Sequence, residues 1–459
     1  MSIETQSVTE ISGTFTIPAS TDLFILSAIA LIVSKKTGSI SPYPQSPIIT
    51  QFCDNCKAVA TFEYVDSVCI VRPIEIEKRE IVLTDPHCAY ADILLLMCLG
   101  AGMSITSYPL SAPKQSYIAS IADTLMCKCS FTSLENVTHS ILDSREQFTF
   151  PKDDMTLETL SPALALAFGL GARITTEIDF AYVTPLRHLF ESLNCGFTVK
   201  SLNKHEPDDP LERRIRLMQK RKKITEGLSF CLSADFSISQ AQMAPPSITL
   251  PGDEALFSLL ICAKSLIQKG NVVINNAPLE PCLTQTLEFI RKMGSRPALQ
   301  ETHTTSFGSC GMAQIQPFVL VGKKTSVTPL LLYKSHIPAM VVIAAFSLGQ
   351  SVFRDATLLR TETPDYIKSL IECLSAVTTH HGEMPDGLIL EGSRQYDGYD
   401  IGTDYGALIS AAFALGGMKC LGKTRCNDTS IEQRFPEFFN TLFALCEYRN
   451  AKNQQQNLL

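Results

Sequence analysis

The chain has 459 residues, of which 45% are apolar and 19% are charged, and its formal net charge is -7 at pH 7. This length allows two or three domains, and this composition is typical of a folded globular protein and excludes a largely disordered one. The negative charge argues against a general nucleic-acid binder.

The N-terminal sequence MSIETQ is polar and acidic, and no basic stretch followed by an apolar run predicts a signal peptide. The longest apolar stretches, such as 91–102 and 337–348, are shorter than the roughly 20 residues that cross a membrane, so no membrane contact is expected. Without an export signal, the 16 cysteines are interpreted as reduced thiols in the core of a cytoplasmic protein.

Cys53 and Cys56 form a CxxC pair, but the second pair that a zinc ribbon requires is missing from the sequence. We therefore predict no metal and no cofactor, while a metal or redox role for these two thiols stays open.

One pattern recurs along the chain: a small or polar opening, an apolar helix, a Gly or basic turn, and a short β-branched strand. Its copies begin near Ser20, Ala89, Leu160, Gly252, Ile337 and Thr403. Each such helix is apolar nearly all round, which predicts burial on all sides. Amphipathic second helices are expected over 283–294, 363–377 and 433–448. The units must pack on one another to bury these helices; the alternative is an ordinary α/β protein with helices of similar composition.

The segment around 200–240 fits none of the copies. It contains HEPDDP and then a basic run from Arg213 to Lys223. A solvated helix or insertion loop is one interpretation, and a docking patch for an acidic protein partner is the other.

Four segments of the chain resemble elements of one known protein family. Residues 251–294, from PGDEALF to RKMG, are similar to the family's fourth repeat, which opens with Gly-Asp and ends in Lys-Met-Gly. DGLIL (386–390) resembles the strand after the fifth repeat. RFPEFF (434–439) resembles the C-terminal Lys-Ser-Phe-Pro-x-Phe-Phe element, and IPAS (17–20) the start of the Pro-Gly-Ser-Lys-Ser signature. These elements are those of the EPSP synthase (3-phosphoshikimate 1-carboxyvinyltransferase), or enolpyruvyl transferase, family. The resemblance runs through the whole chain in order and is clear from residue 251 onward.

The resemblance implies a two-lobed inside-out α/β barrel built from six βαβαββ repeats. Residues 1–19 and 248–459 would form one lobe, and residues 20–247 an inserted second lobe. Enzymes of this kind join phosphoenolpyruvate to a phosphorylated alcohol, and both substrates are multiply anionic. Such a site needs several fixed cations, a carboxylate base and an acid.

The resemblance places many of the family's site residues on residues of a different kind. In the first signature Ser20 is kept, while Lys falls on Thr21 and the second Ser on Asp22. The Arg of the same signature falls on Leu26, and the Arg of the second repeat falls on Asp92. In the third repeat Ser161 is kept, but its Ser and Gln neighbours are replaced by Pro162 and Ala163.

In the C-terminal half, too, the resemblance places several of the family's site residues on residues of a different kind. The family's base matches Asp253. In the Lys-Glu-Ser-Asp-Arg motif, Asp365 is kept, and the other positions read Glu362, Thr363, Pro364 and Tyr366. The Asp-His-Arg motif keeps Asp404 but has Tyr405 and Gly406, and the C-terminal Lys falls on Gln433, beside Arg434.

The candidate site residues are Asp253 as base and, for substrate binding, Ser20, Thr21, Ser161, Asp365, Asp404, Tyr405 and Arg434. Asp253 and Asp404 both precede apolar helices, so they are equally interpreted as N-caps, as are Ser20 and Ser161. Tyr405 belongs to a Tyr-, Gly- and Asp-rich stretch that is either a cleft-facing loop or a turn-rich connection.

A charge-assisted hydrogen bond contributes about 1.5–3 kcal/mol, so losing several cations weakens anion binding strongly. Three hypotheses remain. The chain is an inactive or strongly diverged member of the family, an active transferase with a rearranged site and a less anionic substrate, or a standard enzyme whose motifs are misaligned. The missing cations favour the first and make a phosphoenolpyruvate-like ligand in an interlobe cleft doubtful.

Overall fold

The structure is a computed structural model of the chain. It describes residues 2–75, 80–83, 88–107, 110–125, 127–131, 136–140, 147–150, 157–178, 185–201, 230–236, 245–327, 334–378 and 380–448. The basic run 213–223, with its proposed docking patch, lies outside the described residues.

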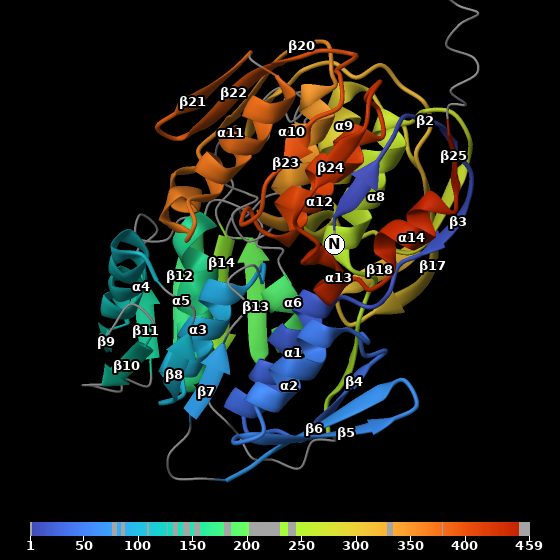
Figure 1. Ribbon diagram of the computed structural model, residues 1–459. Coiled ribbons are helices and arrows are strands. Elements are labelled where there is room, and N and C mark those ends of the chain that lie inside the picture. Colours follow the sequence, from blue (N-terminus) through green and yellow to red (C-terminus); the bar gives the residue numbers. More distant parts are fainter. Residues whose placement is uncertain are drawn as a thin grey trace, which may run out of the picture.

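Apolar helices form the centres of two lobes (Figure 1). One lobe contains α1 (Thr21–Val33), α3 (Ala91–Gly100) and α5 (Leu157–Leu170), and the other contains α8 (Glu254–Leu266), α10 (Ile337–Ala345) and α12 (Ala407–Gly417). Every residue of α1, α8, α10 and α12 is buried, as the all-apolar patterns predict. No helix in the described part of the chain is long and apolar enough to span a membrane.

The remaining helices are shorter or more amphipathic. They are α2 (Pro47–Asn55), α4 (Ala112–Thr124), α6 (Pro185–Ser192), α9 (Gln285–Met293), α11 (Tyr366–Val377), α13 (Ile431–Arg434), α14 (Phe438–Phe443), and the 3-10 helices η2 (Pro281–Leu283) and η4 (Thr357–Thr361). The helices expected over 283–294 and 363–377 are therefore present as α9 and α11.

Five four-stranded sheets share one topology, in which a parallel pair at one edge continues into two antiparallel strands. In the first lobe they are β15 (Ser247–Thr249)-β4 (Gly38–Ser41)-β6 (Val68–Pro73)-β5 (Ala60–Val65), β7 (Glu80–Leu83)-β8 (Ser104–Ser107)-β10 (Asn136–Ser140)-β9 (Lys128–Phe131), and β11 (Gln147–Phe150)-β12 (Arg173–Ile178)-β14 (Phe230–Asp235)-β13 (Gly196–Ser201).

The second lobe contains two sheets of this topology. They are β3 (Gly13–Thr16)-β16 (Val272–Pro278)-β18 (Gly308–Gln314)-β17 (Ala298–Thr305), and β19 (Lys324–Ser326)-β20 (Gly349–Arg354)-β22 (Gly387–Gly392)-β21 (His381–Met384). One smaller sheet has the strand order β1 (Ile3–Thr5)-β24 (Thr424–Cys426)-β23 (Asp400–Ile401), and another pairs β2 (Val8–Ile11) with β25 (Cys446–Tyr448).

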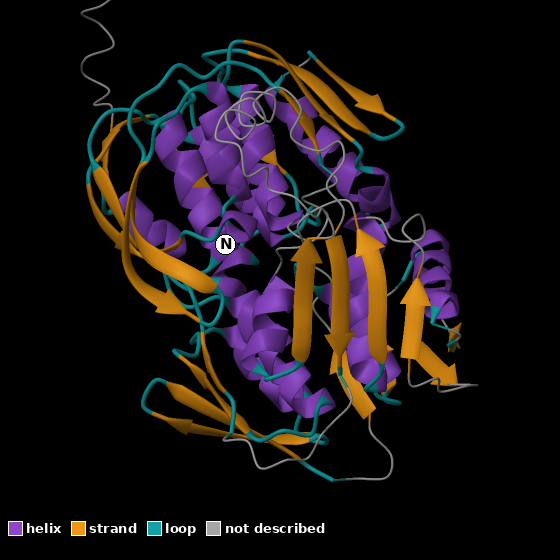
Figure 2. Ribbon diagram, turned by 180° about the vertical axis from the view of Figure 1, so that it is seen from behind, coloured by secondary structure: helices purple, strands orange, loops and turns teal. Residues whose placement is uncertain are grey.

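The sheets lie outside the helices in both lobes (Figure 2). This arrangement is the inside-out α/β fold that the sequence predicted, and that prediction is confirmed. The number of repeats stays a prediction.

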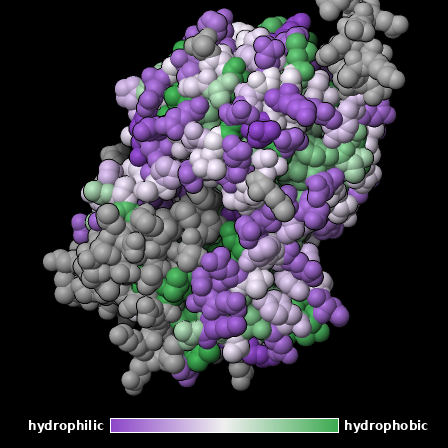
Figure 3. Space-filling view, in the orientation of Figure 1, coloured by the Kyte–Doolittle hydropathy of each residue, from purple (hydrophilic) through white to green (hydrophobic). Residues whose placement is uncertain are grey.

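The buried apolar side chains form two separate clusters. One draws on residues between Ala19 and Leu250, together with Cys282, Leu283 and Phe307. The other draws on residues 3–17 and on residues from Ala255 to Leu442. These clusters support the predicted lobe boundaries, which stay a prediction. On the face shown in Figure 3 most of the coloured surface is hydrophilic, with apolar residues in small groups.

The chain crosses between the lobes twice, and the two crossings lie side by side. Ser20 N donates to Pro251 O at 3.0 Å, and Asp253 N donates to Pro18 O at 2.9 Å. The pairing brings the starts of α1 and α8 together, although they are far apart in sequence.

The helix expected over 433–448 is wrong as a single element. The segment forms α13, α14 and the strand β25. Glu437 has a left-handed φ of 62° directly after Pro436, and a proline followed by such a residue ends the first helix.

Helices α3 and α5 approach closely at two glycines. A Cβ on Gly169 would lie 2.2 Å from Met97 O, and a Cβ on Gly100 would lie 2.5 Å from Leu166 O. Backbone oxygens cannot rotate away, so we expect Gly169→Ala to lower the free energy of unfolding by about 1–3 kcal/mol in urea denaturation. Gly382→Ala is the control, because its Cβ would meet only the Ile389 side chain, at 3.2 Å. Equal losses in the two variants would contradict this account of the helix contact.

Candidate functional site

The starts of α1 and α8 are capped by side chains that also join the two lobes. Ser20 Oγ accepts from Leu23 N at 3.2 Å and donates to Glu254 Oε2 at 2.7 Å. Asp253 Oδ1 accepts from Ala255 N and Leu256 N, each at 3.0 Å. The N-cap interpretation of Ser20 and Asp253 is therefore confirmed.

Thr21 ties the two caps together. Its backbone N donates to Asp253 Oδ2 at 2.9 Å. Both oxygens of Asp253 thus accept from backbone N–H groups, and the residue is 1% exposed. These hydrogen bonds of the carboxylate cap α8 and join the two lobes. Its role as a base stays a prediction.

Three buried carboxylates lie around these caps, with one arginine. Asp22, Asp253 and Glu254 are each 1% exposed. Arg434 Nη2, from the other lobe, donates to Asp22 Oδ1 at 2.5 Å, and their side chains are 2% and 1% exposed. Tyr90 OH donates to Glu254 Oε1 at 3.4 Å. We call Asp22, Asp253, Glu254 and Arg434 the hinge cluster.

Burial raises the pKa values of two carboxyls of the hinge cluster, Asp253 and Glu254. Burial, followed by the negative charges of Asp253 and Asp22, raises the pKa of Glu254 to about 8. Burial also raises the pKa of Asp253 to about 6, although Arg434 acts in the opposite direction. At neutral pH Glu254 therefore keeps its proton in the folded protein.

A second ionic contact joins the lobes away from the hinge cluster. Lys114 Nζ donates to Asp92 Oδ2 at 2.6 Å and to Glu362 Oε1 at 2.9 Å. Lys334 Nζ donates to Glu362 Oε2 at 3.0 Å. Ser111 Oγ donates to Thr361 O across the same boundary at 2.6 Å. We call Lys114, Asp92, Glu362 and Lys334 the lysine cluster.

The charges of the lysine cluster are compensated internally. Burial alone would raise the pKa of Glu362, but Lys334 and Lys114 outweigh it and lower that pKa to about 2. Burial works against the charged form of Lys114, yet Asp92 and Glu362 raise its pKa above the usual range. The resemblance places an Arg of the family on Asp92 and a Lys on Glu362, and this assignment stays a prediction.

Two of the predicted caps are wrong. Ser161 lies inside α5 and is buried, so it does not begin a helix. Asp404 is exposed and accepts from Thr403 Oγ1 at 3.0 Å, whereas Gly406 is the N-cap of α12. Asp404 has a φ of 74°, which turns the chain before the helix can start.

Asp365 and Tyr405 lie on the second lobe. Asp365 caps α11, accepting from Ile367 N at 2.9 Å and from Lys368 N at 3.1 Å. Tyr405 is half-buried against the second apolar cluster. Of the candidate residues, Ser20, Thr21, Asp253 and Arg434 are thus brought together at the hinge, while substrate-binding roles for all of them stay predictions.

Sequence reasoning missed Glu254, Lys114 and Lys334. Glu254 had a signal, since it directly follows the Gly-Asp opening of the fourth copy. The two lysines had none, because each precedes or begins a helix in the manner of an ordinary surface lysine.

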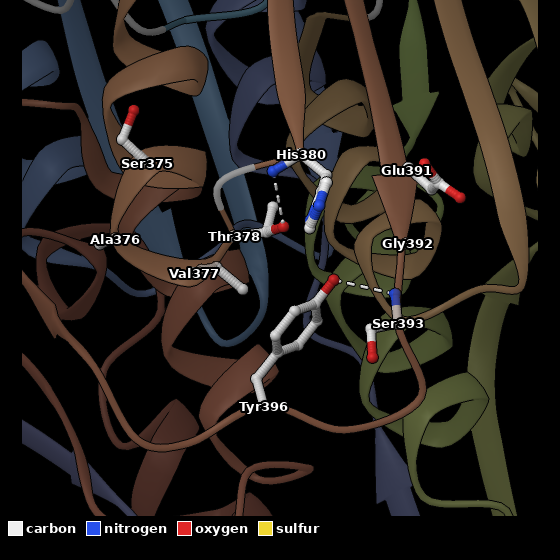
Figure 4. A pocket seen from close by; sticks show the side chains of 9 residues that line it. All are labelled: Ser375, Ala376, Val377, Thr378, His380, Glu391, Gly392, Ser393 and Tyr396. Atoms are coloured by element: carbon white, nitrogen blue, oxygen red, sulfur yellow. Dashed lines mark hydrogen bonds between the residues drawn. The ribbon is translucent and has the colours of Figure 1, made fainter.

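The described residues form several cavities. One of about 270 Å³ lies beside the hinge cluster and is lined by residues that include Thr21, Arg434, Phe15, Leu256 and Phe438. Another of about 560 Å³ lies at the end of α11 and contains none of the candidate residues (Figure 4).

Tyr396 lines this second cavity, with its hydroxyl aimed toward Ser393 (Figure 4). The hydroxyl accepts from Ser393 N at 2.8 Å and donates to Ala345 O at 2.9 Å, so it anchors the loop. Tyr399 OH donates to Phe413 O at 2.6 Å in the core. Tyr396 and Tyr399 therefore hold the loop on the lobe.

The layered fold and the paired lobe crossings define a protein with enolpyruvyl transferase architecture. The EPSP synthase from Acinetobacter baumannii superposes with a TM-score of 0.65 at 15% identity, over 97% of this chain and 98% of that chain. The enolpyruvyl transferase NikO from Streptomyces tendae gives a TM-score of 0.65 at 14% identity, over 98% of both chains.

Sequence matches agree with the fold. The family model for EPSP synthase (3-phosphoshikimate 1-carboxyvinyltransferase) matches residues 235–442. The 3-phosphoshikimate 1-carboxyvinyltransferase of Carboxydothermus hydrogenoformans is 27% identical over 203 residues, 44% of this chain and 47% of the relative. That of Koribacter versatilis is 29% identical over 202 residues, 43% and 47% of the two chains. The matches thus span about half the length of these curated relatives. In sequence, the chain is thus similar to EPSP synthases over residues 235–442, and the whole chain is similar to solved enolpyruvyl transferases in fold.

Proposed function

We propose that this chain is an EPSP synthase-like protein whose lobes are joined by internal ion pairs, so that the standard carboxyvinyl transfer is lost or altered. The observation that carries the proposal is the buried pair between Arg434 and Asp22, 2.5 Å apart across the lobe boundary. Asp22 stands where the resemblance places a serine, next to the position of a ligand-binding lysine.

Anionic ligands would have to compete with the protein's own carboxylates. A phosphate reaching Arg434 must displace Asp22, and one reaching Lys114 or Lys334 must displace Glu362. Opening a buried ion pair costs about 3–5 kcal/mol, because an unpaired charge stays behind. This corresponds to about two to four orders of magnitude in affinity.

Proton transfer is impaired in the same way. A general base must reach the proton that it abstracts, and both oxygens of Asp253 already accept from backbone N–H groups. The resemblance places the family's acid, the Glu of the Lys-Glu-Ser-Asp-Arg motif, on Thr363, which does not titrate in the relevant range. These features favour a scaffold over a working transferase.

The alternative is an active transferase with a rearranged site. It is favoured by the presence of Arg434, Lys114 and Lys334 at the lobe boundary, and by the cavity of about 270 Å³ that Thr21 and Arg434 line. In this case the substrate would be less anionic, and Asp253 would act as the base.

A phosphate-release assay separates the two functions. With phosphoenolpyruvate and shikimate 3-phosphate at millimolar concentrations, we expect release no faster than in the protein-free blank. An active family enzyme under the same conditions serves as the positive control. Release that requires both ligands, and that disappears in Arg434→Met, would overturn the proposal and support the rearranged transferase.

A further inference from the structure

A group of metal-ligating side chains lies at the lobe boundary, outside the hinge and lysine clusters. It consists of His188 from α6 in the first lobe, and Glu280 and Cys282 at the start of η2. One ligand atom from each lies within 4.8 Å of the others. His188 Nε2 is 3.9 Å from Glu280 Oε1.

The imidazole of His188 is poised for a ligand. Its Nε2 atom is buried and makes no hydrogen bond within the described part of the chain. A buried ring nitrogen without a hydrogen bond is costly, and a metal ion would satisfy it. The side chains of His188 and Glu280 are 20% and 22% exposed, which leaves a path for an ion to enter.

The types of ligand atom indicate which metal ion would bind here. An imidazole nitrogen, a thiolate sulfur and a carboxylate oxygen together are typical of Zn²⁺, whereas Mg²⁺ and Ca²⁺ prefer oxygen ligands throughout. Bond lengths of about 2.0–2.3 Å in a tetrahedron place ligand atoms roughly 3.3–3.8 Å apart. The ligand atoms lie within 4.8 Å of one another, so side-chain rotation would have to bring the farthest of them about 1 Å closer.

We propose that His188, Glu280 and Cys282 form a zinc site that ties η2 to α6 and so fastens the two lobes. Cys282 and Leu283 pack in the apolar cluster of the first lobe, although they follow the chain's return to the second. An ion here would fix that docked segment, with water as its fourth ligand. The site is independent of the proposed function.

Cobalt titration of the full, reduced chain tests this proposal. Co²⁺ bound by a thiolate gives an intense near-ultraviolet charge-transfer band, and tetrahedral Co²⁺ gives strong visible bands. We expect both bands to saturate at one ion per chain and to disappear when Zn²⁺ is added. Zn²⁺ should also raise the melting temperature relative to protein in EDTA, since it binds only the folded state.

Ligand variants locate the site. We expect Cys282→Ser to abolish the charge-transfer band, and His188→Gln and Glu280→Gln each to weaken Zn²⁺ binding more than about tenfold. Cys446→Ser is the control, because Cys446 lies on β25 and packs against the apolar cluster of the second lobe. This variant should bind Zn²⁺ as the unaltered chain does. Melting temperatures in EDTA show whether each variant folds. Because Glu280 is partly exposed, its substitution is expected to disturb the fold least.

Two results would overturn the proposal. One is the lack of saturable Co²⁺ and Zn²⁺ binding by the unaltered chain. The other is binding that persists at full strength in His188→Gln or Glu280→Gln, which would place the ion on other thiols.

Discussion

Replacing Arg434 with methionine is expected to lower the free energy of unfolding by about 3–5 kcal/mol. The variant leaves Asp22 buried beside Asp253 and Glu254 without the cation that now lies 2.5 Å from it. Methionine fills much of the same volume, so the loss reports mainly the unpaired charge. Urea denaturation at pH 7.5 measures it.

Arg425→Met is the matched control for this experiment. Arg425 pairs with Glu4 at 3.0 Å, but the two side chains are 55% and 48% exposed. Exposed pairs contribute about 0–1 kcal/mol, so this variant should barely change stability. Losses of similar size in Arg425→Met and Arg434→Met would contradict the assigned role of the hinge cluster.

The unaltered protein is expected to lose stability as the pH rises from about 6 to 8, by on the order of 2–3 kcal/mol from Glu254 alone. The folded-state pKa of Glu254 is raised from 4.5 to about 8. A carboxyl with a raised pKa binds its proton more tightly when folded. Its contribution is complete below pH 4.5 and is lost as the pH rises through 8. Asp253, whose pKa is raised to about 6, contributes the same trend at lower pH.

Glu254→Gln isolates this contribution. The amide oxygen can still accept from Ser20, but the side chain cannot ionise, so stability should become nearly flat between pH 6 and 8. Glu63→Gln is the control, because Glu63 is exposed and pairs with Arg72 on the surface. Chemical denaturation across this pH range measures both. An unchanged slope in Glu254→Gln would show that Glu254 does not hold a proton in the folded state.

Local patterns predicted much of the fold. The apolar helices follow from runs of apolar residues, and the caps at Ser20 and Asp253 follow from a polar residue before such a run. The same rule failed at Asp404 and Ser161. At Asp404 the backbone turns with a positive φ before the helix begins at Gly406, and Ser161 lies inside a helix that starts earlier.

The long-range part of the site could not be read from local patterns. Asp22 and Arg434 are 412 positions apart, and only the folded chain shows that they meet. From the sequence, Asp22 and Asp92 are predicted to be acids at or near positions of family cations, where they would repel an anionic ligand. The structure shows that Arg434 and Lys114 compensate them. At the lobe boundary each of these two acids is therefore paired with an arginine or a lysine of the chain itself.

Calorimetric titration of the chain with phosphoenolpyruvate and shikimate 3-phosphate, separately and together, tests the central claim most directly. If the protein's own carboxylates are paired with the arginine and the lysines of the lobe boundary, neither ligand will give binding heat at millimolar concentration. Micromolar binding would contradict the account, and would mean that ligand anions displace Asp22 or Glu362 or meet cations elsewhere in the cleft.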